Sequence, residues 1–159
     1  MASTILSAML GANTHAVAGS TRLKATIAGH IYNIEAANDI DNGCIVGKGE
    51  FLRPEVYAEA AASATFAGKI VGQAANGNWY VEVTACEEGD CLVLTVPLLY
   101  ENYVVANQDE ANFYNAKGDI LRCYELYVGD VFELSEVGFD GTPEAGKTVS
   151  VTAKKLVVA

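Results

Sequence analysis

The sequence predicts a mainly β protein, with a compact β-barrel or β-sandwich-like domain over residues 30–159 and an extended N-terminal arm over residues 1–29. Large apolar residues occur in short runs that glycine, asparagine and aspartate separate, which is typical of small β-rich proteins. The chain has 159 residues, enough for one domain with a hydrophobic core. Only one stretch is rich in alanine, so we expect at most one or two short helices.

The expected arm consists mostly of small residues without a regular period. Gly11, Gly19 and Gly29 interrupt any helix in this part of the chain. We therefore expect residues 1–29 to be extended and to become ordered on a partner.

The first elements after the arm follow from alternation and turn residues. Residues 30–36 and 44–46 are predicted strands, and Asn42-Gly43 between them favours a type I′ turn. The alanine-rich stretch covers residues 55–67 and directly follows Pro54. Because helices often begin after a proline, we predict a short helix there.

The middle of the chain contains two further predicted strands. Residues 78–84 alternate between apolar and polar side chains, as a half-buried strand does. Residues 91–96 form a dense apolar run, which indicates a strand buried on both faces, and Pro97 limits its continuation. Residues 99–117 mix aromatic and polar side chains without a sustained period, so we expect a long loop or a broken helix.

The last third of the chain is predicted to be β structure and turns. Residues 119–134 indicate two strands joined through Val128-Gly129-Asp130. Residues 138–147 consist of turn residues, and residues 148–159 alternate again. We therefore expect the chain to end in a strand.

Charge is distributed unevenly along the chain. All 20 acidic residues lie between Glu35 and Glu144, whereas residues 1–34 carry a net charge of +2 and residues 145–159 one of +3. The net charge of the whole chain is −10. This pattern suits a soluble acidic body with terminal arms that lie on a protein surface of opposite charge. No cluster of lysine and arginine is present, so we expect no nucleic-acid partner.

The N-terminal stretch and the cysteines indicate the compartment. The first 19 residues lack a basic region, and their apolar run is too short to span a bilayer, so neither a secretory signal nor a membrane anchor is expected. The four cysteines do not have the spacing of a dense disulfide scaffold. We expect reduced, partly buried thiols in a protein made inside a cell.

Two short motifs have the composition of ligand sites. Cys86 and Cys91 flank an acidic turn, for which three interpretations stand: a plain turn between strands, a local disulfide, or a metal site. Residues 38–43 resemble a calcium loop in composition, but Gly43 falls one position early for an EF-hand, so a turn is predicted.

Catalytic chemistry has little support in the residues. Both histidines, His15 and His30, fall in or beside the expected arm, far from an ordered carboxylate that would orient them. No nucleophile elbow is present. We predict a protein that is not an enzyme and binds no metal or cofactor, with a small hydrolase that uses acidic residues as a weaker hypothesis.

Aromatic residues provide a candidate interaction surface. Tyrosine and phenylalanine mixed with asparagine, glutamine and glutamate are typical of protein interfaces, although core packing explains part of such a group. The candidates are Tyr100, Tyr103, Phe113, Tyr114, Tyr124 and Tyr127, of which the first four are predicted interface residues.

The order of several segments resembles a known family. These segments are Ile31-Tyr32-Asn33, residues 39–52, Glu55-Val56-Tyr57, residues 95–102 and residues 111–139. Together they resemble small head decoration, or cement, proteins encoded beside the major capsid protein of tailed bacteriophages. The resemblance covers roughly residues 30–140 and includes no catalytic motif.

The resemblance implies a structural virion protein on the outer capsid surface, made in the host cytoplasm and often a homotrimer. Its partner would be the major capsid protein, and binding across adjacent subunits would stabilise the shell. We expect the arm to bind the capsid through Ile5, Leu6, Met9, Leu10, Val17, Arg22 and Lys24.

An alternative is a carbohydrate- or receptor-binding module of the virion, as part of a head fibre or the tail. In that case Trp79, Tyr100 and Tyr103 would stack on sugars.

Overall fold

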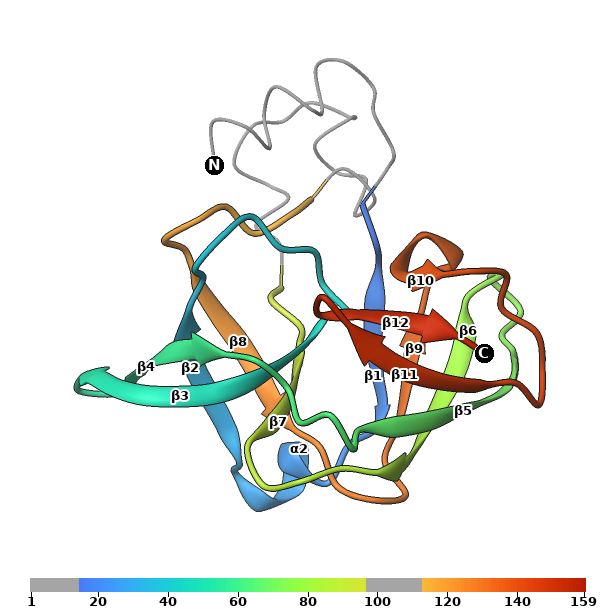
Figure 1. Cartoon of the computed structure of the whole chain (residues 1–159), viewed down its shortest axis with the longest axis horizontal. Coiled ribbons are helices and arrows are strands. Elements are labelled where there is room, and N and C mark those ends of the chain that lie inside the picture. Colours follow the sequence, from blue (N-terminus) through green and yellow to red (C-terminus); the bar gives the residue numbers. More distant parts are fainter. Residues whose placement is uncertain (1–14, 97–112) are drawn as a thin grey trace, which may run out of the picture.

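The computed structural model describes residues 15–96 and 113–159, which fold into two β-sheets that lie side by side (Figure 1). One sheet is a closed barrel of five strands, and the other is an open sheet of seven strands. This architecture confirms the predicted mainly β class with little helix.

The barrel has the strand order β2-β4-β3-β7-β8, and β8 pairs with β2 to close it. All neighbours are antiparallel except β2 and β4. The barrel strands are β2 (Ile31–Glu35), β3 (Ile45–Arg53), β4 (Val56–Ala60), β7 (Asp90–Val93) and β8 (Ile120–Glu125).

The open sheet has the order β1-β9-β6-β5-β11-β12-β10. Its edges are β1 and the two-residue β10, which pairs in parallel with β12. The strands of this sheet are β1 (Ala18–Arg22), β5 (Ala67–Gln73), β6 (Trp79–Ala85), β9 (Val131–Leu134), β10 (Phe139–Asp140), β11 (Thr148–Thr152) and β12 (Lys155–Val158).

Helix is confined to two short elements in the described residues, α2 (Ala25–Ala28) and the 3₁₀ turn η3 (Glu136–Gly138). Helix α2 ends at Gly29, whose φ of 79° is left-handed and favours glycine. Within residues 15–96 and 113–159, no helix has the length and apolar character that crossing a membrane requires.

Strand β7 is buried on both faces, as its apolar run predicts. Cys91 and Val93 point into the core of the barrel, whereas Leu92 belongs to a second core. Successive side chains of a strand point to opposite faces, so one strand contributes to both cores. Ile45 and Val46 on the neighbouring β3 divide in the same way.

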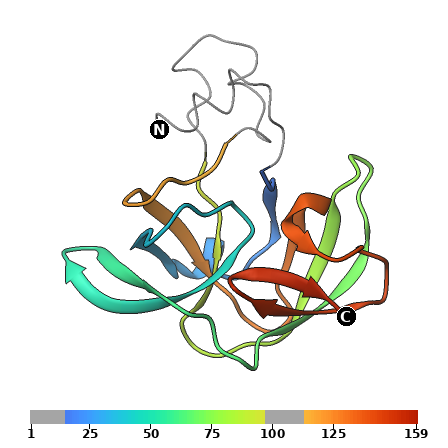
Figure 2. The same ribbon diagram turned by 45° about the horizontal axis from the view of Figure 1, so that its top comes forward.

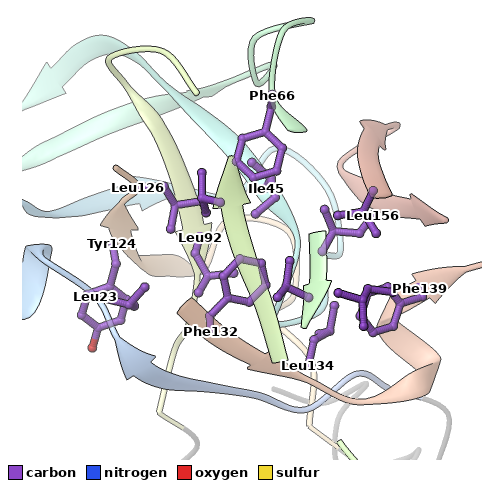
Figure 3. Packing of buried hydrophobic residues seen from close by; sticks show 14 of the residues in the cluster. Leu23, Ile45, Phe66, Leu92, Tyr124, Leu126, Phe132, Leu134, Phe139 and Leu156 are labelled. Atoms are coloured by element: carbon purple, nitrogen blue, oxygen red, sulfur yellow. The ribbon is translucent and has the colours of Figure 1, made fainter. Parts of the chain in front are cut away.

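The second core joins the two sheets, and we call it the shared core (Figure 3). Leu92 and Tyr124 enter it from the barrel, and Phe132 and Leu134 enter it from the open sheet. Four of its largest side chains, Ile45, Leu92, Phe132 and Leu134, are fully buried. Burial of each such side chain contributes about 1.5–3 kcal/mol, so the barrel and the sheet stabilise each other.

The chain passes between the two sheets four times, through residues 23–30, 61–66, 86–89 and 126–130. We call these the crossing segments, and all four lie at the lower end of the molecule in Figure 1. Their backbone groups lie outside the regular ladders and require other partners.

Asp90 supplies partners to three crossing segments. Its buried carboxylate accepts hydrogen bonds from Ser63 N at 2.8 Å, Ser63 Oγ at 2.6 Å and Glu87 N at 2.9 Å. Its carbonyl accepts a bond from Leu126 N at 2.8 Å. Residues 61–66, 86–89 and 126–130 therefore converge on one residue.

Asp130 connects the remaining crossing segment. Its buried carboxylate accepts hydrogen bonds from Lys24 N at 3.2 Å and Tyr127 N at 2.9 Å, while its carbonyl accepts one from Val83 N at 2.8 Å. Residues 23–30 are thus held against the segment that follows β8.

A partly buried ion pair joins the sheets at another point. Lys154 Nζ, in the turn between β11 and β12, lies 2.6 Å from Glu59 Oε1 on β4. The carbonyl of Lys154 also accepts a hydrogen bond from Ile45 N at 2.8 Å. Ala153 and Lys154 have φ angles of 49° and 70°, which are costly for residues with a Cβ. These contacts with the barrel offset that cost.

Two local predictions are wrong. Residues 55–67 do not form a helix, because Val56 to Ala60 form strand β4 between β2 and β3. Glu55 has a φ of 64°, which is incompatible with the start of a right-handed helix. The strands around Asn42-Gly43 exist but do not form a hairpin, since β3 pairs with β4 and β7.

The predicted boundary between arm and domain at residue 30 is also wrong. Residues 18–22 form β1, which pairs with β9 in the open sheet. Ala16, Leu23 and Ala25 are buried in the shared core. Residues 15–29 therefore belong to the folded body, and the rest of the expected arm lies outside the described residues.

Asp90→Asn should lower the free energy of unfolding by about 3 kcal/mol. The amide NH₂ of asparagine would face the N–H and O–H donors of Ser63 and Glu87, which now bind the carboxylate. Urea unfolding followed by the fluorescence of Trp79, the only tryptophan, measures this. Asp140→Asn is the control: Asp140 is exposed, and it should change stability by less than about 0.5 kcal/mol. Equal effects of the two substitutions would contradict the role of Asp90.

Two thiols, that of the partly buried Cys44 and that of the buried Cys91, should make the protein less stable in alkali. Burial raises the pKa of Cys44 to about 11 and that of Cys91 to about 12, from an ordinary value of 9.0. Above about pH 9 the unfolded chain loses these protons while the folded chain keeps them, so stability decreases as pH rises. Between pH 8 and pH 10 the loss should be about 1 kcal/mol for each thiol.

The contribution of Cys91 can be isolated with Cys91→Ala. The substitution should lower stability at both pH values but reduce the difference between pH 8 and pH 10 by about 1 kcal/mol. Urea unfolding at the two pH values measures the difference, and an unchanged difference would contradict the assignment.

Candidate interaction site at the anchoring loop

Residues 39–43, Asp-Ile-Asp-Asn-Gly, connect β2 to β3 and form the candidate site. We call them the anchoring loop. Their predicted turn conformation is confirmed, with Gly43 at a φ of 88°. A Cβ at this glycine would collide with Leu134 Cδ1, so the loop packs closely on the open sheet.

Asp41 binds the first residues of the described chain. Its Oδ1 lies 2.7 Å from His15 Nδ1, and its Oδ2 accepts a hydrogen bond from Ala16 N at 3.3 Å. The His15 ring also stacks on Tyr114, with ring centroids 4.6 Å apart. His15 and Ala16 are therefore fixed at the anchoring loop.

Asn42 binds Thr95 and Asn115, which lie on either side of residues 97–112 in the sequence. Its side chain donates to Thr95 O at 2.9 Å and accepts from Thr95 N at 3.0 Å. Its Oδ1 also accepts a bond from Asn115 Nδ2 at 3.2 Å. Asn42 and Asn115 are both buried, so these amide groups depend on each other for partners.

Backbone contacts complete the arrangement. Ile40 and Asn115 exchange two backbone hydrogen bonds at 2.8 and 2.9 Å. Asp39 Oδ1 accepts a bond from Lys117 N at 2.9 Å. The anchoring loop thus contacts residues next to all three points at which the described chain begins or breaks. Figure 1 shows these points together at the upper end of the molecule, opposite the crossing segments.

The surface beside the anchoring loop contains charges of both signs. A pocket of about 270 Å³ is lined by Asp39, Asp41, Lys154 and Lys155, among others. Lys154 is engaged by Glu59, whereas Lys155 is exposed. The basic C-terminal region therefore lies beside acidic residues of the loop.

Several predicted site residues belong to the body. Val17 exchanges two hydrogen bonds of 2.9 Å with Ser135, through its N–H and its carbonyl. Arg22 donates to Gly129 O at 3.3 Å, and Lys24 Nζ lies 4.8 Å from the centre of the Tyr127 ring. Arg22 and Lys24 thus contact the crossing segments, and the expectation that these three residues form an arm is wrong.

The other predicted site residues divide into two groups. Phe113 and Tyr114 are 8% and 6% exposed, so they lie inside the body beside the anchoring loop. The remaining candidates lie outside the described residues; they are Ile5, Leu6, Met9, Leu10, Tyr100 and Tyr103.

The prediction for the histidines needs correction. His15 pairs with Asp41, and His30 Nδ1 lies 3.3 Å from Glu125 Oε2, so each histidine has an ordered carboxylate. Trp79 on β6 packs against the shared core, a contact that favours a packing role over sugar stacking.

The turn between Cys86 and Cys91 is confirmed, and both cysteines are free thiols in the structure. The Cys86 thiol donates to Leu126 O at 3.4 Å. Burial, followed by the charge of Asp90, raises the pKa of Cys86. The thiol is therefore protonated near neutral pH and is a poor nucleophile.

No protein-family model, curated protein or solved structure matches this chain.

Asn42→Ala should lower the free energy of unfolding by about 2–3 kcal/mol, because it leaves groups of Thr95 and Asn115 without their partners. Amide hydrogen exchange at Thr95 and Asn115 should accelerate more than exchange in β5 and β6. Asn38→Ala is the matched control, since Asn38 is exposed one position before the loop. If both variants behave alike, Asn42 does not anchor these segments.

Proposed function

We propose that the protein is a non-enzymatic virion protein that decorates the outer surface of a tailed-phage capsid. In this proposal the end of the molecule that carries the anchoring loop faces the shell. Residues 1–14 and 97–112 then contact the major capsid protein across adjacent subunits.

The observation that carries the proposal is the convergence at the anchoring loop. Most of the candidate binding residues belong to two segments far apart in the sequence, residues 1–14 and 97–112. Asp41 holds His15, which follows the first segment, and Asn42 holds Thr95 and Asn115, which flank the second, at one end of the body. Both sets of candidates can therefore reach one partner surface at the same time.

Charge gives independent support. An acidic body with a net charge of −10 resists self-association and stays in solution before it meets a shell. Residues 1–14 contain no acidic side chain. An arm without acidic residues avoids repulsion from an acidic partner surface.

The free energies of burying and ordering one arm indicate why attachment to the capsid would use many copies of the protein. Each large apolar side chain that becomes buried contributes about 1.5–3 kcal/mol, while each residue that becomes ordered costs about 1–2 kcal/mol. One copy of the arm therefore attaches weakly. A homotrimer, which is part of the proposal, brings three arms to one site and raises the affinity through effective concentration.

Deletion of residues 1–14 should reduce binding to capsids at least about tenfold while the body stays folded. The deletion stops before His15 because residues 15–29 belong to the body. Sedimentation of the variant with particles that lack the protein measures binding, and circular dichroism measures folding.

Substitutions in the full-length protein distinguish the loss of side-chain contacts from the loss of the segment itself. Replacement of Ile5, Leu6, Met9 and Leu10 by serine should reproduce the effect of the deletion. Replacement of Ser3, Thr4 and Ser7 by alanine is the control in the same segment and should leave binding unchanged. Retained binding by both the deletion and the serine variant would refute the arm as the capsid contact.

A further inference from the structure

A second candidate site lies at the opposite end of the molecule, near α2 and the crossing segments (Figure 1). It is a pocket of about 480 Å³ between the start of β2, the turn after β6 and the segment after β8. We call it the Glu125 pocket. His30, Tyr32, Glu87, Glu88, Glu125 and Tyr127 are among its lining residues.

Glu125 is the central polar group of this pocket. Its side chain is 7% exposed, and its Oε2 accepts a hydrogen bond from the Tyr32 hydroxyl at 2.8 Å. His30 Nδ1 lies 3.3 Å from the same oxygen. No residue in the described part of the chain donates a hydrogen bond to Oε1. Oε1 is accessible to solvent in the pocket, so a donor that enters the pocket can reach it.

The neighbours of Glu125 cannot supply that donor readily. Burial, and then the hydrogen bond to Glu125, raises the pKa of Tyr32, so its hydroxyl stays protonated and committed to Oε2. The Cys86 thiol is committed to Leu126 O. A hydrogen bond to Oε1 therefore comes from solvent or from a ligand in the pocket.

The composition of the lining favours a ligand with a positive charge. Glu87, Glu88 and Glu125 supply three carboxylates, and neither lysine nor arginine is among the described lining residues. Hydrogen-bond acceptors therefore exceed donors, whereas sugars need both. A compact cation with several N–H donors fits this composition best.

Two aromatic rings of the pocket already interact with ammonium groups of this chain. Lys24 Nζ lies 4.8 Å from the centre of the Tyr127 ring, and Lys48 Nζ lies 4.3 Å from that of Tyr32. Neither lysine is among the lining residues. Tyrosine rings attract cations through their quadrupole, so these rings add to the attraction of the carboxylates.

We infer that the Glu125 pocket binds a primary alkylammonium group, with Glu125 and the rim carboxylates accepting its N–H donors and Tyr127 as an aromatic wall. A lysine side chain of a partner protein and a free polyamine share this chemistry. The inference does not rest on the proposed capsid role, because it depends on a different end of the molecule.

The test is a titration of the ¹⁵N-labelled full-length protein, followed by NMR, with N-acetyl-lysinamide as the probe. N-acetyl-norleucinamide, which has a similar side chain without the ammonium group, is the control ligand. The lysine probe should shift the amide signals of His30, Tyr32 and residues 125–128. It should bind at least about tenfold more tightly than the neutral ligand.

Variants locate the site. Glu125→Gln and Tyr127→Leu should each weaken binding at least about fivefold, whereas Glu136→Gln, an exposed acidic residue on η3, should leave it unchanged. If Glu125→Gln fails to fold, Tyr127→Leu and Glu88→Gln at the exposed rim decide the question.

Spermidine distinguishes the two sources of the ammonium group. Tighter binding of spermidine would support a free polyamine, and tighter binding of N-acetyl-lysinamide would support a lysine side chain. Equal binding of the lysine and norleucine probes, or the absence of shifts with both amines, would overturn the inference.

Discussion

Asp90 connects three segments that the regular sheet ladders leave without partners, two through its carboxylate and one through its carbonyl. A barrel and an open sheet that share one core require the chain to cross between them, and each crossing exposes backbone donors. Asp90 satisfies donors in residues 61–66 and 86–89, and its carbonyl satisfies one in residues 126–130. Because the carboxylate is buried, its charge-assisted bonds are strong, and loss of one partner leaves the others unsatisfied.

This arrangement separates the two ends of the molecule. The crossing segments lie at one end of the molecule, which Figure 2 shows from a second direction. Residues of three of them line the Glu125 pocket. The opposite end carries the anchoring loop, whose Asp41 and Asn42 hold chain segments at the start and the internal break of the described residues. Opposite ends of one body are therefore available for different partners.

The sequence predicted the local features well and the pairing of distant residues poorly. The apolar run at residues 91–96 gave a strand buried on both faces, because burial alone determines that pattern. Strand β4 was missed since alanines favour helix locally, whereas pairing with β2 and β3 decides the outcome. The anchoring loop was recognised as a turn, but the partners of Asp41 and Asn42 lie 25 to 73 positions away. No local pattern identifies such partners, and the same holds for the contact of His30 with Glu125.

The most direct test of the proposed role is the copy number of this chain in purified phage particles. Quantitative mass spectrometry gives the ratio of the chain to the major capsid protein. A decoration protein should occur at a ratio near one or at a simple fraction of it, because it follows the shell lattice. A few copies per particle would indicate a portal, tail or fibre component, and absence from the particles would contradict the virion role.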